Sequence, residues 1–423
     1  MDATWLENIP TNWPLMRFGA IFTQRKKRNE ALCRNFVLSV LKGRGVIPYK
    51  EKGDIGNKVS EDLSNYKFVN KGDFVLNSMN LYMGSVGVSK YSGITSTAYI
   101  VCTPSEDIIP EFYGFLIQAR GFQEYAGQFG NGILEIREAV RWTALRNIKI
   151  PLPPLEEQRE IAGFLDRETT KIDQQIERIA LLQELLKEQR KSLITHAVSG
   201  QKPGVGVMTM NWTKTLPDHW DLKRLQIVGQ IQLSNVDKHS QENELPVKLC
   251  NYTDVYHNEF ITPELTLMRA TASLPEIIKF HIVEGQILLT KDSETPDDIG
   301  NPALVKYSDD YTLCGYHLAQ FTPDPAKLEG RYGRYCLASD KLNDQFKVSA
   351  KGVTRFAIGK REISDFLFPL PPLEEQREIA DFLDRETTKI DQQIGLLTEI
   401  KERFSEKRAA LITAAVTGQI AVS

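Results

Sequence analysis

The sequence lacks the features that mark a membrane, secreted or metal-dependent protein. No apolar run approaches the ~18 residues of a membrane span, and the first residues do not show the basic-then-apolar order of a signal peptide. The five cysteines are scattered without C-x-x-C spacing, which indicates reduced thiols, and the six histidines form no cluster with metal-ligand spacing. We therefore expect a cytoplasmic protein with no bound metal and no membrane association.

Motifs of common enzyme classes are also missing. The chain has no G-x-x-x-x-G-K-[S/T] phosphate loop and no G-x-S-x-G elbow. Asn301–Leu304 has one proline and no aromatic, where a DNA methyltransferase needs an acidic-Pro-Pro-aromatic motif. The E-x-K spacing of nucleases occurs at Glu399–Lys401, with no acidic partner in view, and it leaves a stand-alone nuclease as a minor alternative. We expect no catalytic residues and interpret the chain as a binding subunit.

Charge is nearly balanced overall but uneven along the chain. The net charge of the 423 residues is −3, so any basic surface must be local. Residues 14–50 carry nine Lys or Arg against one acid, Glu30. The candidates for phosphate contacts are Arg25, Lys26, Lys27, Arg28 and Arg44. A solvated loop explains the same pattern, and the sequence leaves both interpretations open.

A long internal repeat organises the chain. Residues 151–176 recur at 369–394 without a gap, and 25 of 26 positions match, the exception being Gly163 against Asp381. Residues 188–201 align with 406–419 at the same shift of 218, and Trp5 aligns with Trp212 at a shift of 207. Little common sequence lies between these anchors. The chain therefore consists of two half-copies, each a variable segment followed by a nearly invariant one.

Each repeated block predicts a helix of roughly 44 residues. A proline-rich opening can lead into a first turn, the acids that follow suit the positive helix end, and Gly200 or Gly418 stands where a helix commonly stops. Apolar residues recur every seven positions, which is typical of a coiled coil. One helix packed on a globular core is the alternative, but two such helices favour an antiparallel pair. The expected seam is Leu165, Ile172, Ile179, Leu186, Leu193, Leu383, Ile390, Leu397, Phe404 and Leu411.

A coiled coil needs only its apolar stripe, yet polar residues of the blocks are identical as well. We expect them to be exposed and to dock the same partner protein twice. A recent duplication without selection would also explain the identity. The candidates are Gln158, Arg159, Asp166, Arg167, Gln376, Arg377, Asp384 and Arg385.

The variable segments show mixed α and β patterns. Short β-rich stretches occur at 36–41, 74–76, 98–101, 148–150, 246–249, 286–289 and 367–370. Residues 71–80 (KGDFVLNSMN) and 284–293 (EGQILLTKDS) match as a glycine turn, an apolar strand and a polar tip. Polar side chains at such tips can bond base edges or phosphates, although loop ends are often simply polar. The candidates are Asn77, Ser78, Asn80, Thr290, Lys291 and Asp292, with Arg137 and Arg355 after later glycine turns.

The predicted fold class is α+β. Two mixed α/β domains are each followed by a long helix, and the helices pair as an antiparallel coiled coil with pseudo-two-fold symmetry. The expected boundaries are 1–154 for the first domain, 155–198 for its helix, 199–211 for a linker, 212–372 for the second domain and 373–417 for its helix.

These features together resemble the specificity subunit of type I restriction-modification systems. The resemblance covers essentially the whole chain and is carried by the paired PLPPLEEQREIA openings at 151–162 and 369–380, the long helices behind them, the W-x4-P-x2-W segments that start at Trp5 and Trp212, and the KGDFVL and EGQILL strands. The resemblance implies two target recognition domains, each reading half of a split sequence in double-stranded DNA, with the coiled coil fixing the gap.

The resemblance also implies the partners. Two methyltransferase (M) subunits would dock on the repeated regions, and restriction-translocase (R) subunits would join them. S-adenosylmethionine, ATP and magnesium would belong to those partners, with no cofactor in this chain. The alternative from another class is a coiled-coil scaffold that holds two copies of a protein and never touches DNA.

Overall fold

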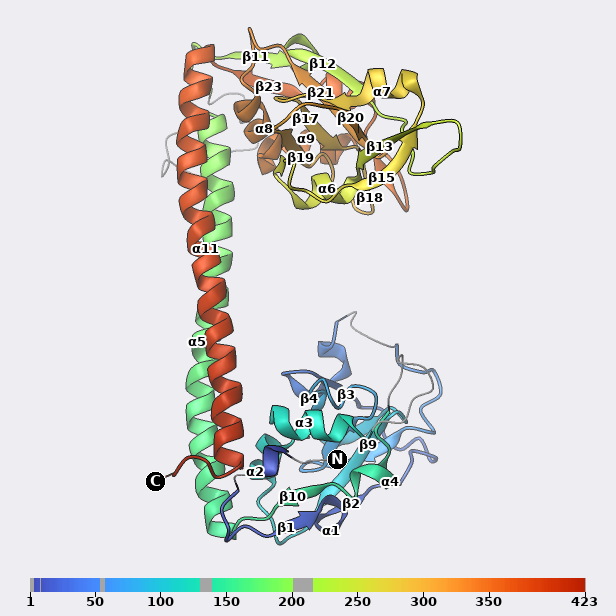
Figure 1. Cartoon of the computed structure of the whole chain (residues 1–423), viewed down its shortest axis with the longest axis vertical. Helices are drawn as coiled ribbons and strands as arrows, with labels where there is room; N and C mark the ends of the chain where they lie inside the picture. Colours follow the sequence, from blue (N-terminus) through green and yellow to red (C-terminus); the bar gives the residue numbers. More distant parts are fainter. Residues whose placement is uncertain (1–3, 8, 54–57, 130–138, 201–215, 423) are drawn as a thin grey trace. The chain divides into compact units, whose positions relative to one another are not determined.

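The computed structural model describes residues 4–7, 9–53, 58–129, 139–200 and 216–422. The chain divides into two units, Met1–Ala180 with Thr398–Ser423, and Leu181–Leu397. Two long helices, α5 (Leu155–Val198) and α11 (Leu373–Val416), contribute residues to both units (Figure 1). Within the described ranges, no helix combines the length and apolarity that crossing a membrane requires.

The first unit contains two four-stranded sheets and a two-stranded ribbon. One sheet has the order β2-β9-β6-β7, formed by Phe22–Gln24, Tyr99–Pro104, Phe74–Asn77 and Val86–Val88. The other has the order β4-β3-β8-β5, formed by Gly45–Pro48, Val37–Leu41, Gly93–Thr95 and Lys67–Val69. The ribbon pairs β1 (Leu15–Arg17) with β10 (Lys149–Pro151). The helices are η1 (Thr4–Leu6), α1 (Phe18–Ile21), η2 (Tyr49–Glu51), α2 (Pro110–Leu116), α3 (Arg120–Gly127) and α4 (Trp142–Leu145).

The second unit is built on the same plan. Its five-stranded sheet has the order β12-β21-β17-β19-β14, formed by Gly229–Leu233, Leu318–Pro323, Ile287–Thr290, Pro302–Val305 and Phe260–Ile261. Its four-stranded sheet has the order β15-β13-β20-β16, formed by Met268–Ala272, Leu245–Cys250, Asp309–Cys314 and His281–Ile282. Two ribbons pair β11 (Asp221–Arg224) with β23 (Leu367–Leu370) and β18 (Asp292–Ser293) with β22 (Phe356–Ala357). The helices are η4 (Leu225–Ile227), α6 (Tyr252–His257), α7 (Leu274–Phe280), α8 (Gly330–Ala338), α9 (Asp340–Ser349) and α10 (Lys360–Ser364).

Both domains share one topology, although their sequences have little in common. In the first unit β3 runs antiparallel to β4 and parallel to β8, and in the second β13 runs antiparallel to β15 and parallel to β20. The sheets β2-β9-β6-β7 and β12-β21-β17-β19 also match strand for strand, with β14 as an added edge strand in the second unit. The repeat therefore extends through the variable segments as structure.

The predicted strands are confirmed at β3, β6, β9, β10, β13, β17 and β23. Strands β6 and β17 follow glycine turns at Gly72 and Gly285, which have φ values of 90° and 86°. Glycine adopts this left-handed backbone without the steric cost of a Cβ atom. The matched turn-strand pattern read from the sequence therefore has a matched backbone conformation.

A short ribbon connects each domain to its long helix. Leu15 pairs with Pro151 in the first unit, and Leu222 pairs with Pro369 in the second, so the two registers agree. A two-stranded ribbon has free edges, which is where proline is tolerated because it cannot donate to a ladder. The prolines after the ribbon then lead the chain into α5 or α11.

The main core of each unit includes residues from both long helices. In the first unit, Ile161 and Leu165 of α5 are buried with Ile412 and Val416 of α11 among the aromatic residues of the domain. The second unit reverses these roles, because Ile194 and Val198 of α5 join Ala380 and Leu383 of α11. Each domain therefore packs against the start of one helix and the end of the other.

Within each unit α5 and α11 run antiparallel (Figure 1). Arg408 donates to Asp173 at 2.8 Å in the first unit, and Arg190 pairs with Asp391 at 2.9 Å in the second. These two ion pairs join equivalent positions, since 190 and 173 become 408 and 391 on adding the repeat shift of 218. All ten predicted seam residues are buried or half-buried. Leu165 and Leu383 belong to the domain cores, so the first residue of the apolar stripe on each helix packs against a domain.

Candidate functional site

The first turn of each long helix is tied to its domain by a buried glutamine. Gln158 accepts a hydrogen bond from the backbone N–H of Ile109 at 2.8 Å and donates to the carbonyl of Pro153 at 2.7 Å. Gln376 does the same with Glu329 at 2.9 Å and Pro371 at 2.9 Å. The expectation that these two glutamines are exposed is wrong, because both are almost fully buried. Their identity in the two blocks has a structural cause.

A glutamate and a tryptophan form a second matched junction. The indole N–H of Trp13 donates to Glu157 at 2.7 Å, and that of Trp220 donates to Glu375 at 3.1 Å. The helix ends also match. A Cβ at Gly418 would lie 2.4 Å from the Pro10 ring, and one at Gly200 would lie 2.3 Å from the Pro217 ring. These two glycines therefore serve close packing as well as their positive φ of 69°.

The other predicted docking residues lie mostly at the surface. Arg159, Asp166, Arg167, Arg377 and Arg385 are exposed, and Asp384 is half-buried. Arg159 and Arg377 each pair with the glutamate three residues earlier at 3.2 Å. These exposed groups remain the candidates for contacting a partner.

The basic segment of the first domain contains one structural arginine. Arg25 forms a two-point ion pair with buried Asp73, at 2.7 and 2.9 Å, and also donates to Thr103. Its charge is thus used within the domain. Lys26, Lys27 and Arg28 are exposed beside it; Arg28 donates to Asn65 at 3.0 Å, and the Lys27 ammonium lies 5.3 Å from the Phe68 ring centroid. Arg44 is also exposed and donates to the backbone carbonyl of Glu51 at 3.1 Å.

The polar groups at the strand tip of the first domain become more exposed along the chain. Asn77 is buried and accepts from the backbone of Met79, and the Ser78 hydroxyl donates to the carbonyl of Ala98 at 2.7 Å. Asn80 is exposed one step further along. Asn77 therefore shapes the loop, whereas the exposed Asn80 side chain makes no hydrogen bond to another described residue. Arg137 lies outside the described residues.

The strand tip of the second domain holds its backbone in the same way. Ile358 donates to the carbonyl of Lys291 at 2.9 Å, as Val140 donates to Ser78 at 2.9 Å in the first domain. Thr290 is fully buried, and its hydroxyl accepts from the N–H of Asn301. Lys291 donates to the carbonyl of Ser234, and its half-burial lowers the pKa of the ammonium, which Asp292 opposes.

The structure joins two predicted residues that are far apart in the sequence. Arg355 donates to Asp292 at 2.8 Å, and His317 approaches the other oxygen of Asp292 at 2.8 Å. The Arg355 side chain is 58% exposed, whereas that of Asp292 is 11% exposed, so the carboxylate holds a guanidinium that faces solvent. This geometry resembles a fixed donor fork, the arrangement that suits bidentate contacts with guanine or phosphate.

Aromatic residues around this tip were missed in the sequence. Tyr316 is exposed, its ring lies 5.0 Å from the Lys291 ammonium, and it contacts the His317 ring edge to face. Tyr252 and Tyr256 of α6 stack with a ring separation of 5.6 Å. The only available signal was a tyrosine-histidine pair before a strand, which is too common to single out. We define the tip cluster as Lys291, Asp292, Tyr316, His317 and Arg355.

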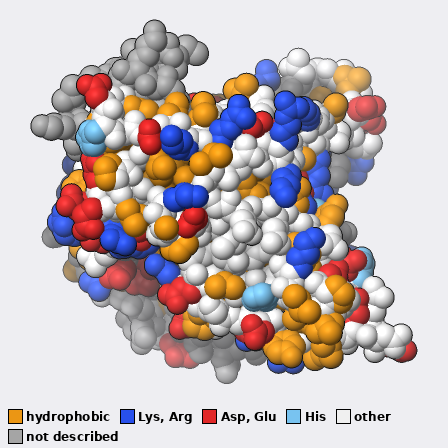
Figure 2. All heavy atoms as spheres, turned by 90° about the horizontal axis from the view of Figure 1, so that it is seen from above, with side chains coloured by type: hydrophobic (Ala, Val, Ile, Leu, Met, Phe, Trp, Pro, Cys, Tyr) orange, Lys and Arg blue, Asp and Glu red, His pale blue; other side chains and the backbone are white. Residues whose placement is uncertain are grey.

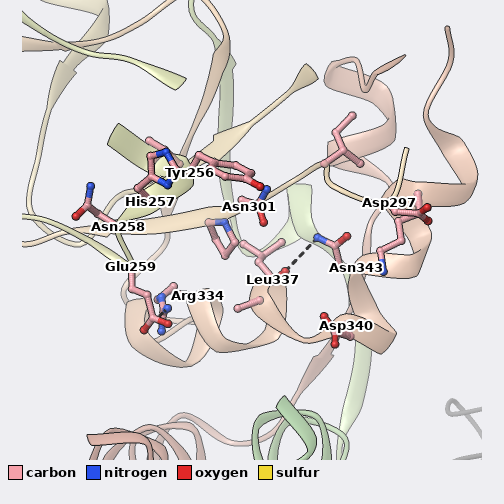
Figure 3. Close-up of a pocket in the computed structure, with 15 residues that line it drawn as sticks. Tyr256, His257, Asn258, Glu259, Asp297, Asn301, Arg334, Leu337, Asp340 and Asn343 are labelled. Atoms are coloured by element: carbon pink, nitrogen blue, oxygen red, sulfur yellow. Dashed lines mark hydrogen bonds and ion pairs between the residues drawn. The ribbon is translucent and has the colours of Figure 1, made fainter. Parts of the chain in front are cut away.

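A pocket of about 340 Å³ lies elsewhere in the second unit, and Figure 3 shows Glu259 and Arg334 facing one another at its wall. Arg334 pairs with Glu259, Asp340 with Lys191, and Lys347 with Asp344. Burial alone would raise the pKa of Glu259, but Arg334 and Arg190 outweigh burial and hold it below its ordinary value. Glu259, Arg334, Asp340 and Lys347 are thus paired within the unit.

On the face seen in Figure 2, the described Lys and Arg side chains are interspersed with acidic and apolar ones. Burial raises the pKa of the Cys314 thiol to about 12, so it stays protonated at neutral pH. Among the described residues, no group of three or more His, Cys, Asp or Glu is arranged to hold a metal ion.

The sequence is similar to a known protein family over most of its length. The family model described as the type I restriction modification DNA specificity domain matches residues 10–185 and 217–402. The MjaVIII specificity subunit of a type I restriction enzyme from Methanocaldococcus jannaschii is 24% identical over 426 residues, which cover 98% of this chain and 94% of that protein. The EcoBI specificity subunit of Escherichia coli is 31% identical over 109 residues, 23% of each chain.

Solved structures show the same fold. A chain from a structural study of complex assembly and conformational transition in the type I R-M system aligns with a TM-score of 0.71 at 17% identity, covering 97% of this chain and 99% of that one. The HsdS subunit from Thermoanaerobacter tengcongensis aligns with a TM-score of 0.50 at 18% identity, covering 97% and 98%.

Proposed function

The chain belongs to the type I restriction modification DNA specificity family, and from this we propose that it selects the DNA target of a type I restriction-modification complex. Each domain reads one half of a split sequence in double-stranded DNA. The paired helices set the gap between the half-sites, and the exposed parts of the repeated helices dock two methyltransferase subunits. Restriction-translocase subunits complete the complex. S-adenosylmethionine, ATP and magnesium are bound by those partners. This chain contributes recognition without catalysis.

The observation that carries the proposal is the equivalence of the two strand tips. Both domains place a polar segment after the same strand, hold it with the same backbone hydrogen bond, and differ in the side chains presented. One topology with different tips is the arrangement expected of two readers of different half-sites. In the second domain the tip cluster offers a carboxylate-held arginine and a lysine beside an aromatic ring.

Phosphate contacts would supply affinity, and base contacts would supply selectivity. Lys26, Lys27 and Arg28 are suited to phosphates, which gives a contribution that falls with salt. Arg355 and Asn80 are suited to base edges, where a good bidentate contact is worth about 1–3 kcal/mol of discrimination.

The test is to co-express the chain with the methyltransferase subunit of its own system and to map methylated sites across the genome. We expect one split motif with a fixed, non-specific gap. Arg355→Ala should relax one half-site and leave the other intact, and Asn80→Ala should do the reverse. The two variants are each other's control, because a general loss of folding would affect both half-sites.

Other outcomes would refute this function. If methylation is absent, or is the same without the chain, the chain does not select the target. In that case two bound partners without DNA retention would support the scaffold alternative.

A further inference from the structure

The one difference between the repeated blocks lies on a largely exposed stripe of the helix. Positions 159, 163, 166 and 170 of α5 share a face by their i, i+4 and i+7 spacing, and so do positions 377, 381, 384 and 388 of α11. We call these the α5 stripe and the α11 stripe. They begin alike, because Arg159 and Arg377 make the same ion pair with the preceding glutamate. They differ from the next turn onward.

The α11 stripe is covered by an arginine of its own domain. Arg331 of α8 donates to Asp381 at 2.7 Å and to Asp384 at 2.9 Å, and it also bonds Glu329 at 2.8 Å. Tyr335 donates its hydroxyl to Asp384 at 2.7 Å. Although partial burial opposes it, the hydrogen bonds to the three carboxylates raise the pKa of Arg331. Both aspartates of this stripe therefore have partners within the chain.

Among the described residues, no arginine of the first domain pairs with the α5 stripe in this way. Helices α2 and α8 align through Tyr113 and Tyr332, because each hydroxyl donates at 3.0 Å to the carbonyl of the equivalent proline, Pro151 or Pro369. In this alignment Phe112 stands at the position of Arg331 and Leu116 at that of Tyr335, and both are fully buried in the domain core. No cation of α2 is thus directed at the stripe.

Asp166 is consequently left exposed. In the parts of the chain that the structure describes, its carboxylate makes no hydrogen bond or ion pair. Gly163, one turn earlier, adds no carboxylate. A Cβ at this glycine would meet only the tip of Arg167, at 3.6 Å, so packing does not require glycine here.

We propose that the two docking surfaces are unequal and that a methyltransferase subunit with a basic side chain at this contact loads first on the α5 stripe. The inference rests on the proposed docking function. A lysine or arginine of the partner can pair with Asp166 directly, whereas on the α11 stripe it must compete with Arg331. Exposed ion pairs of this kind change a dissociation constant by up to about fivefold. Two blocks that are almost identical in sequence thus give an ordered assembly.

The experiment titrates the purified methyltransferase subunit into the full chain and follows the one- and two-partner complexes by native mass spectrometry. For the wild type we expect two binding steps whose constants differ beyond the statistical difference of two equal sites. Asp166→Asn should weaken the tighter step severalfold. The matched variant Asp384→Asn should leave that step unchanged, and Arg331→Ala should strengthen the weaker step.

A further variant distinguishes the effect of Arg331 from that of the single sequence difference at position 163. Gly163→Asp makes the two blocks identical, yet the steps should stay unequal, because Arg331 remains on one side alone. Statistically equal steps in the wild type, or equal effects of the two aspartate variants, would overturn the inference while leaving two-fold docking intact. If the wild-type chain binds no methyltransferase, the docking function fails, and the inference fails with it. The helical circular dichroism of every variant serves as the folding control.

Discussion

Single residues of the repeated block divide into those that hold the fold and those that remain free. Gln158 and Glu157 are used at the junction of domain and helix, where they satisfy backbone and indole N–H groups. Arg159 and Asp166, on the same helix, face outward. Identity between copies therefore has two causes, internal hydrogen bonding and the proposed common partner, and only burial separates them.

The buried glutamine gives a direct prediction. Gln158→Ala should destabilise the first unit by about 1–3 kcal/mol, because it leaves a buried N–H and a buried carbonyl without partners. Gln376→Ala should do the same in the second unit. Arg159→Ala is the matched control on the same helix turn and should change stability by less than about 0.5 kcal/mol. Urea unfolding measures the change, and an equal effect of Arg159→Ala would contradict the structural role.

Glu259 gives a prediction on pH. Its folded pKa is depressed below the ordinary 4.5 by Arg334 and Arg190, so its contribution to stability is present above that pH and is lost as the pH falls further. Glu259→Gln should lower the stability of the second unit at neutral pH and flatten its pH dependence in acid. Urea midpoints over this range test the prediction, and parallel wild-type and variant profiles would refute it.

Helices α5 and α11 are the elements in which the sequence repeat is strongest. Their seam is apolar, while the equivalent pairs Arg408–Asp173 and Arg190–Asp391 are placed where they can fix the antiparallel register. Polar pairs at a helix seam commonly select one register at some cost in stability. In the second unit Arg190 also pairs with Glu259, and this ion pair joins the domain to the helix.

The role of the seam is tested by placing a charged side chain in its apolar stripe. Ile172→Asp or Ile390→Asp should disrupt helix pairing, because each side chain is buried and an unpaired carboxylate there is costly. Binding to the split DNA target should be lost in complexes that carry either variant. Leu181→Asp is the control, since Leu181 lies on α5 with Ile172 but is 63% exposed. Wild-type affinity and spacing in the Ile172 variant would exclude a role for the seam in recognition.

At the scale of the whole molecule, one topology occurs twice and the long helices contribute to both units. In the proposed function, this organisation assigns the choice of bases to the strand tips and the choice of spacing to the helices. The two properties should therefore be changeable independently.

Helix length provides the test. Seven residues of heptad sequence inserted after Ala180, with seven more before Thr398, keep the seam in phase. Each helix then lengthens by ~10 Å, which corresponds to about three base pairs. We expect methylation mapping to recover the same half-sites with a gap about three base pairs longer. An unchanged gap would show that the helices do not set it.

Much of this organisation could be predicted from local patterns in the sequence. The heptad stripe, the proline opening and the glycine end predicted both long helices. Short β-rich stretches, two of them after glycine turns, predicted seven of the strands. Such signals are readable because they depend on residues a few positions apart. The shared topology of the domains was not readable, since a fold tolerates many sequences that keep burial at the same positions.

The sequence by itself determined that the chain is a duplication, where its helices run and which family it resembles. Only the tertiary structure decided which polar residues are free. Gln158 was expected at the surface but is buried against the backbone of its domain, Arg355 meets Asp292 across 63 positions, and Arg331 covers Asp384 while Asp166 stays open. The physical reason is that a side chain's partners come from whatever the fold places beside it, and sequence separation does not limit that choice.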